Sequence, residues 1–220
     1  MPRWLVVPLA FLTVALCLVS FRLFGHELAL VPGNPALTQF NKDQPVDDRD
    51  VARLRASREQ GLLWYEHSET WGELGLALLL QDRHADEDDG RPSAALHALS
   101  KSLRRQPVQP HGWLRHALAL RKTEAASEAV AAALLLSVST GPYTVEILAF
   151  RLRLLLQYAP FFVGEAHNPL PTQIRHVWRL APQQVVDAAL RADAVKIVAR
   201  VLADDREDLM AFARLISRQR

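Results

Sequence analysis

An uninterrupted apolar run near the start of the chain constrains its fold most. Residues 4–21 (WLVVPLAFLTVALCLVSF) contain no charged side chain. As a helix rising about 1.5 Å per residue, this run would extend roughly 27 Å, close to the ~30 Å hydrocarbon core of a bilayer. It ends without a small-x-small cleavage motif, and the bulky Leu16 precedes Cys17, where a lipoprotein signal needs a small residue. We therefore predict an uncleaved membrane anchor over residues 1–25, with a cleaved signal or a buried core helix as alternatives.

The charges flanking the apolar run bear on its orientation. Arg3 and the amino group precede the run and Arg22 follows it. The positive charges on the two sides therefore nearly balance, and the positive-inside rule does not decide the orientation. Insertion with the amino terminus in the cytoplasm is the simpler topology, and it places the rest of the chain outside. In a Gram-negative cell this predicts a single-pass protein of the bacterial inner membrane with a periplasmic domain. Residues 26–49 contain three prolines and one glycine, and we expect a non-helical spacer there.

Charge and composition exclude several classes of function. The chain has 26 basic and 24 acidic residues, and both excess positive charges lie within residues 1–25. The remaining chain is formally neutral, so a nucleic-acid partner is not expected. There is one cysteine, no histidine–cysteine cluster and no glycine-rich phosphate loop. We therefore expect neither a metal nor another cofactor.

The periodicity of residues 50–220 predicts an all-α domain. No segment alternates apolar and polar residues between turn signals, whereas apolar residues recur at helical spacing throughout. Asp50, Asp193 and Asp204 are suitable N-caps. About ten helices joined by short loops favour a helical-hairpin array over a bundle of long helices. The predicted helices are 50–65, 68–79, 95–103, 113–120, 124–139, 144–159, 172–180, 182–191, 193–202 and 204–218.

A diverged repeat is present within this helical region. The tetratricopeptide unit has about 34 residues and the pattern W-x2-L-G-x2-Y, followed by small residues and a proline. Trp71 begins one match and Trp113 begins a second, 42 residues later, which we interpret as 34 residues plus an eight-residue insertion. The repeat predicts a tetratricopeptide-like α-α superhelix; a non-repeating helical domain with two core tryptophans is the alternative. The residues expected to pack the hairpins are Trp71, Leu74, Gly75 and Ala95 in the first copy, and Trp113, Ala117 and Ala129 in the second.

The segment 133–143 (ALLLSVSTGPY) resembles a junction found in the VpsP-like exopolysaccharide biosynthesis proteins. In that family an arginine follows on the next helix, a position that Arg151 or Arg153 could occupy. The segments 102–113 and 173–178 resemble the family's preceding repeat and later arginine–tryptophan helix. The resemblance implies an accessory role at the inner membrane in making, polymerising or exporting a surface polysaccharide, and it implies no catalytic residue. In physical terms, Thr140-Gly141-Pro142 is a helix stop.

The residues with catalytic or metal-binding chemistry do not form a recognisable site. The acidic segment 82–90 lacks the spacing of a calcium loop, because an acid is missing at the twelfth position. The eight histidines are scattered, without H-E-x-x-H. Glu66, Glu69 and Glu73 have a spacing that is common by chance on helices. We therefore expect that the protein is not an enzyme.

These observations predict a scaffold that binds protein components of a polysaccharide synthesis or export machine. Basic side chains on the helical array are the expected partner contacts: Arg104, Arg105, Arg115 and Arg151. Two alternatives remain. One is a glycan-binding or glycan-modifying periplasmic protein in which aromatic residues line a sugar-stacking groove, among them Trp64, Tyr65, Tyr158, Phe161, Phe162 and Trp178. The other is a general assembly chaperone, for example in cytochrome maturation.

Overall fold

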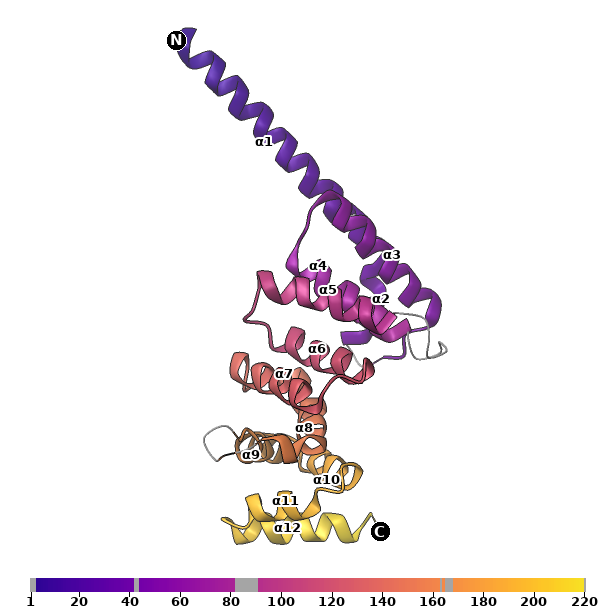
Figure 1. The fold of residues 1–220 in the computed structure, drawn as a ribbon, viewed down its shortest axis with the longest axis vertical. Helices are drawn as coiled ribbons and strands as arrows, with labels where there is room; N and C mark the ends of the chain where they lie inside the picture. The colour runs from indigo at the N-terminus through magenta and orange to yellow at the C-terminus, as the bar shows by residue number, and fades with distance from the viewer. Residues whose placement is uncertain (1–2, 42–43, 82–90, 163, 165–167, 220) are drawn as a thin grey trace. The chain divides into compact units, whose positions relative to one another are not determined.

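The computed structural model describes the chain except residues 1–2, 42–43, 82–90, 163, 165–167 and 220 (Figure 1). All regular secondary structure in the described residues is helical, which confirms the predicted all-α class. The chain divides into two compact units, Met1–Pro107 and Val108–Arg220, in place of the single domain predicted over 50–220. The N-terminal unit contains α1 (Arg3–Leu30), α2 (Asn34–Asn41), α3 (Asp48–Trp64), α4 (Ser68–Gln81) and α5 (Arg91–Arg105). The C-terminal unit contains α6 (Pro110–Lys122), α7 (Ser127–Thr140), α8 (Val145–Gln157), α9 (Leu170–Leu180), α10 (Pro182–Arg191), α11 (Val195–Leu202) and α12 (Arg206–Ser217).

Helix α1 is long and apolar enough to cross a membrane. Its apolar side chains are exposed along much of its length, including Phe11, Leu16 and Phe21. A soluble protein would bury such a surface, so the alternative of a buried core helix does not fit. The helix continues past the predicted end of the anchor at residue 25 and ends at Leu30, where its last turns pack beside α3 (Figure 1).

The prediction of a non-helical spacer over residues 26–49 is wrong. A 3-10 turn at Val31–Gly33 leads directly into α2, and both belong to the N-terminal unit. Pro32 and Pro35 are compatible with helix because they occupy first turns, where the missing N–H has no intrahelical partner. Gly33 permits a close approach, since a Cβ there would lie 2.2 Å from the hydroxyl oxygen of Ser57. Ala36 is then buried against α3 and α4.

Three aspartates were predicted to cap helices, and none of the three is the cap. Asp47 caps α3 by accepting a hydrogen bond from the backbone nitrogen of Asp50 at 2.7 Å. Asp205 caps α12 in the same way, one residue after the predicted Asp204. Asp193 has a left-handed backbone (φ 50°) just before α11, whose N-cap Ala194 has no side-chain hydrogen bond. The caps of α3 and α12 shift by three residues and one residue because a neighbouring aspartate takes the position.

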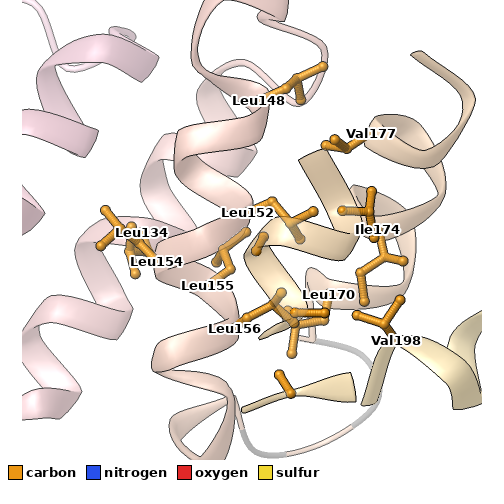
Figure 2. Close-up of a cluster of buried hydrophobic side chains, with 14 of the residues drawn as sticks. Leu134, Leu148, Leu152, Leu154, Leu155, Leu156, Leu170, Ile174, Val177 and Val198 are labelled. Carbon is orange, nitrogen blue, oxygen red and sulfur yellow. The ribbon is translucent and has the colours of Figure 1, made fainter. Parts of the chain in front are cut away.

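The core of the C-terminal unit surrounds α8. Leu152, Leu154, Leu155 and Leu156 are all buried, so most of the second half of this helix is covered (Figure 2). Side chains from α7, α9, α10 and α11 supply the covering layer. Trp178 of α9 is buried and contacts Phe212 of α12 edge-on, with ring centres 5.9 Å apart. Burial of about 25 cal/mol per Å² of apolar surface makes this cluster the main stabilising element of the unit.

The two predicted hairpins, α4–α5 and α6–α7, have equivalent internal packing. Ser102 donates to the backbone oxygen of Ser68 at 2.7 Å, and Ser137 donates to that of Pro110 at 2.8 Å. The first-helix positions therefore differ by 42 residues and the second-helix positions by 35. The segment between the two bonded positions is thus seven residues longer in the first hairpin than in the second. These offsets also relate buried Leu99 to buried Leu134.

This register corrects one predicted packing position. Ala129 is exposed on α7, and Val130, which is 2% exposed, takes the place equivalent to Ala95. Leu74, Ala95 and Ala117 are buried as expected, and a Cβ at Gly75 would lie 2.5 Å from Cγ of Leu99. The tryptophans Trp71 and Trp113 are half-buried. Their insertion between successive hairpins, and the superhelix itself, stay predictions.

Candidate functional site

Arg151, in the middle of α8, is fully buried in the C-terminal unit. Its guanidinium donates hydrogen bonds to the backbone oxygens of Ser137 (2.8 Å), Gly141 (2.8 Å) and Pro142 (3.0 Å). Gln173 of α9 accepts from Nε at 3.2 Å and from Nη2 at 2.9 Å, and its amide nitrogen donates to Pro142 at 3.0 Å. The prediction that Arg151 contacts a partner is therefore wrong, because its polar atoms are all used inside the unit.

The charge of Arg151 is stabilised by dipoles. No carboxylate in the described part of the chain pairs with it; its acceptors are carbonyl and amide oxygens. Some of these carbonyls are at the end of α7, where the last backbone oxygens lack intrahelical partners and carry partial negative charge. Desolvation by burial lowers the pKa of Arg151 to about 10, which leaves it cationic at neutral pH. Arg151 thus satisfies backbone oxygens of the Thr140–Tyr143 junction from inside the unit.

The other three predicted contact arginines are closer to solvent. Arg104 and Arg105 are exposed in the last turn of α5, a favourable place for positive charge. Arg105 donates to the backbone oxygen of Glu66 at 3.1 Å and pairs with its carboxylate, which lowers the pKa of Glu66. Arg115 is half-buried on α6, in the other unit. The structure therefore does not assemble the predicted set into one site.

An open groove of about 240 Å³ lies between α8 and α10 of the C-terminal unit. Its apolar part is formed by two alanines and a phenylalanine, and its polar part by two arginines, an aspartate and a glutamine. We call this feature the arginine groove. Its lining residues are Ala149, Phe150, Arg153, Gln184, Asp187, Ala188 and Arg191.

The arginine groove carries a net positive charge, because its lining contains two arginines and one aspartate. In the described part of the chain neither Arg153 nor Arg191 forms an ion pair. The carboxylate of Asp187 accepts a hydrogen bond from Gln219 at 2.7 Å. Partial burial and the charges of Arg191 and Arg121 lower the pKa of Arg153, whose guanidinium carbon lies 4.7 Å from the ring centre of Phe150. The two arginines repel each other, and a carboxylate placed between them would relieve this repulsion.

Two of the three glutamates considered as acid–base candidates pair with arginines, and Glu69 is exposed on α4. Glu66 pairs with Arg105, and Glu73 accepts from Nε of Arg58 at 2.7 Å. Among the described residues no group of three His, Cys, Asp or Glu side chains could hold a metal ion. The acidic segment 82–90 lies outside the described residues.

Two of the aromatic residues considered for sugar stacking belong to the core. Trp178 is 5% exposed and Phe162 is 6% exposed, so neither presents a ring face to solvent. Phe161 is more open, at 38%. Phe150, which the sequence did not single out, has a comparable exposure of 36% and lies in the arginine groove.

Sequence reasoning missed the arginine groove for a physical reason. From the sequence, Arg153 is only an alternative to Arg151 as the arginine that follows the junction. Arg191 has no predicted role. A spacing of three on α8 places Phe150 and Arg153 on one face, which is a detectable signal. Arg191 follows 38 residues later, and only the packing of α10 on α8 brings it to the same groove.

No protein-family model matches the chain, and no curated protein gives a significant match to it. A functional conclusion therefore depends on the geometry of the described residues and on the short resemblance around residues 133–143. The arginine groove supplies this geometry, because in it two arginines without an ion-pair partner among the described residues adjoin apolar surface.

Proposed function

We propose that this protein is a non-catalytic, membrane-anchored adaptor that binds an acidic segment of a partner protein in the arginine groove. The observation that carries the proposal is the pair Arg153 and Arg191, which lack ion-pair partners in the described part of the chain. Guanidinium groups bind carboxylates through two parallel hydrogen bonds. Phe150 and Ala188 provide an adjoining apolar surface. The matching ligand is an aspartate or glutamate next to an apolar residue.

The setting that we propose is the assembly that makes, polymerises or exports a surface polysaccharide at the bacterial inner membrane. The resemblance of residues 133–143 to the VpsP-like junction supports this setting. The hydrogen bond from Arg151 to Gly141 supports Arg151 as the arginine that follows the junction, and the equivalent packing of α4–α5 and α6–α7 supports a tetratricopeptide-like hairpin array. The folded units would lie in the periplasm, with α1 in the membrane.

Membrane anchoring makes a small groove sufficient for binding. A groove of about 240 Å³ accommodates one or two side chains, so its intrinsic affinity is low. When α1 and a membrane-embedded partner share one bilayer, the second contact forms at an effective concentration on the order of millimolar. The adaptor would therefore bind its partner in the membrane and release it readily on detergent extraction.

A photo-crosslinking residue at Gln184, inside the arginine groove, tests the proposal in native membranes. We expect one discrete adduct, identified by mass spectrometry as a component of the polysaccharide machine. The same residue at Met210, which is 54% exposed on α12 and does not line the groove, serves as the matched control. The double charge reversal Arg153→Glu with Arg191→Glu should abolish the adduct and reduce polymer production in a complemented deletion strain.

Other outcomes would contradict the adaptor proposal or favour one of the two alternative functions. An adduct that survives charge reversal, or full polymer production by the charge-reversed protein, would contradict the adaptor proposal. Saturable quenching of tryptophan fluorescence by oligosaccharides, measured on the full chain in detergent, would favour the glycan-binding alternative. A haem-handling protein as the crosslinked partner would favour the assembly chaperone.

A further inference from the structure

The C-terminal end of α3 packs against the membrane helix. Trp64 contacts Phe21 of α1 edge-on, with ring centres 5.7 Å apart. One turn further along α1, Gly25 makes room for the same indole, because a Cβ there would lie 2.7 Å from two of its ring carbons. The indole therefore occupies a place on α1 between Phe21 and Gly25, and a larger side chain at residue 25 would displace it.

The residues on either side of this tryptophan are apolar and exposed. Leu63 is 75% exposed and Tyr65 is 46% exposed, although both belong to or directly follow a helix end that packs on α1. Apolar exposure on α1 itself extends past the contact, with Phe24 at 65% and Leu28 at 59%. The apolar surface of the span thus continues onto the end of α3.

The position of the contact along α1 sets its depth in a bilayer. Phe21 is the last residue of the charge-free run, and Arg22 follows it. At about 1.5 Å per residue, Phe21 and Gly25 lie roughly 6 Å apart along the helix. With residues 4–21 in the hydrocarbon core, this interval lies at the boundary between acyl chains and headgroups. Tryptophan and tyrosine are the side chains that favour this boundary.

Basic residues adjoin the same place. Tyr65 is followed by Glu66, to which Arg105 donates a hydrogen bond at 3.1 Å. That contact brings the last turn of α5, with its exposed Arg104, next to the end of α3. Cations at this level without an ion-pair partner among the described residues, such as Arg104, are attracted to anionic lipid headgroups.

We propose that Leu63, Trp64 and Tyr65 form a membrane corner, a second contact of the N-terminal unit with the bilayer that α1 spans. Leu63 and Tyr65 enter the headgroup boundary, and Trp64 links them to α1. The corner holds the unit at a fixed height and orientation on the membrane surface. This inference requires α1 to be inserted, but it does not depend on the partner proposed for the arginine groove.

Fluorescence quenching by lipid-attached nitroxides tests the corner in the full chain. In a Cys17→Ser background, single cysteines replace Leu63, Leu12 or Arg53 and carry an environment-sensitive label, in nanodiscs of phosphatidylcholine and phosphatidylglycerol. Leu12 lies within the span and reports its insertion. Arg53 is an exposed position on α3, ten residues before Leu63 and therefore about 15 Å further along that helix.

We expect the Leu63 label to emit at shorter wavelength than the Arg53 label and to be quenched at least twofold more by headgroup-level nitroxides. A Leu63 label as exposed to water as the Arg53 label, while the Leu12 label is quenched, would overturn the proposal. An unquenched Leu12 label would overturn it as well, because α1 would not be inserted. If the Leu63 label were shielded only when two copies share a nanodisc, the corner would be a self-association surface, which also contradicts the proposal.

Discussion

Two arginines are buried for similar structural reasons, one in each unit. Arg58 of α3 is 1% exposed and donates to Glu73 (2.7 Å), to the backbone oxygen of Leu30 (2.8 Å) and to the side-chain oxygen of Asn34 (2.9 Å). It thereby ties the end of α1 to α3 and α4. Arg151 binds the end of α7 in a comparable way, but without a carboxylate. Both guanidinium groups satisfy backbone oxygens that a helix end or turn leaves unpaired.

Replacing Arg151 should destabilise the C-terminal unit strongly. Arg151→Met removes the buried charge but leaves the oxygens of Ser137, Gly141 and Pro142 without their donor, so we expect a loss of about 3 kcal/mol. Arg151→Lys keeps the charge and should lose less, although one ammonium cannot reach every acceptor. Urea unfolding of the full chain in detergent, followed by tryptophan fluorescence, measures both. Arg153→Met, two residues away on the same helix, should change stability by less than about 0.5 kcal/mol. Equal midpoints for the Arg151→Met protein and the wild type would contradict this account.

Burial of these arginines could not be predicted from the sequence. Arginine at helical spacing is usually a solvated residue, and nothing local distinguishes Arg58 or Arg151 from exposed Arg53. What decides the difference is the position of backbone oxygens on other elements, such as Leu30 and Gly141. The family resemblance did predict an arginine after the junction, but it could not show that this side chain points inward.

At the scale of helices, the α4–α5 hairpin depends on one close approach. Gly75 lies against Leu99, and a Cβ would come within 2.5 Å of Cγ and 2.8 Å of Cδ2 of that leucine. Gly75 is buried and the side chain of Leu99 is fully enclosed, so Leu99 has little room to move. The equivalent place in α6–α7 is occupied by Ala117.

Gly75→Ala should therefore destabilise the N-terminal unit, against the usual helix preference for alanine. Alanine gains about 1 kcal/mol in helix propensity, whereas overpacking costs 1–3 kcal/mol, so we expect a net loss of about 1 kcal/mol. Combining Gly75→Ala with Leu99→Val should cost less than the sum of the two single changes, because valine vacates the space. A double-mutant cycle from urea unfolding measures this coupling. Strict additivity would show that the close approach does not constrain the hairpin.

Helices were easier to predict from the sequence than their ends or their connections. Pro107 and Gly141-Pro142 stop helices in any environment, so α5 and α7 end near the expected residues. The prediction of a spacer over residues 26–49 failed because proline and glycine occur both in linkers and in the first turns of helices. The tertiary contacts show that the segment is folded, among them the fit of Gly33 against Ser57 and the burial of Ala36. The one-residue register error at Ala129 arose from assuming a 34-residue unit where second-helix positions differ by 35.

At the scale of the whole molecule, each unit has its own core and should respond separately to substitution. Hydrogen–deuterium exchange of the full chain resolves the two. Arg151→Met should raise deuterium uptake in α7, α8 and α9 and leave α4 and α5 unchanged, whereas Gly75→Ala should do the reverse. Equal increases across both units for either substitution would indicate a single cooperative unit.

The C-terminal unit should lose stability as the pH falls. Burial lowers the pKa of His111, His116 and His176 below the ordinary 6.5, and neighbouring arginines lower it further for His111 and His176. The unfolded chain then binds protons at higher pH than the folded unit does, so the free energy of unfolding decreases from about pH 7 to about pH 5. Urea midpoints at several pH values measure the slope. The triple histidine-to-glutamine variant should show a smaller slope, and an unchanged slope would exclude these histidines as the cause.

Helix α1 continues without interruption from the apolar run to Leu30, where its end is held by Arg58. A continuous helix cannot swivel at the membrane surface as a flexible tether would. Any change in the tilt of the span, for example in a thicker or thinner bilayer, must therefore turn the N-terminal unit with it. Lipid composition would in this way set the angle between the N-terminal unit and the bilayer.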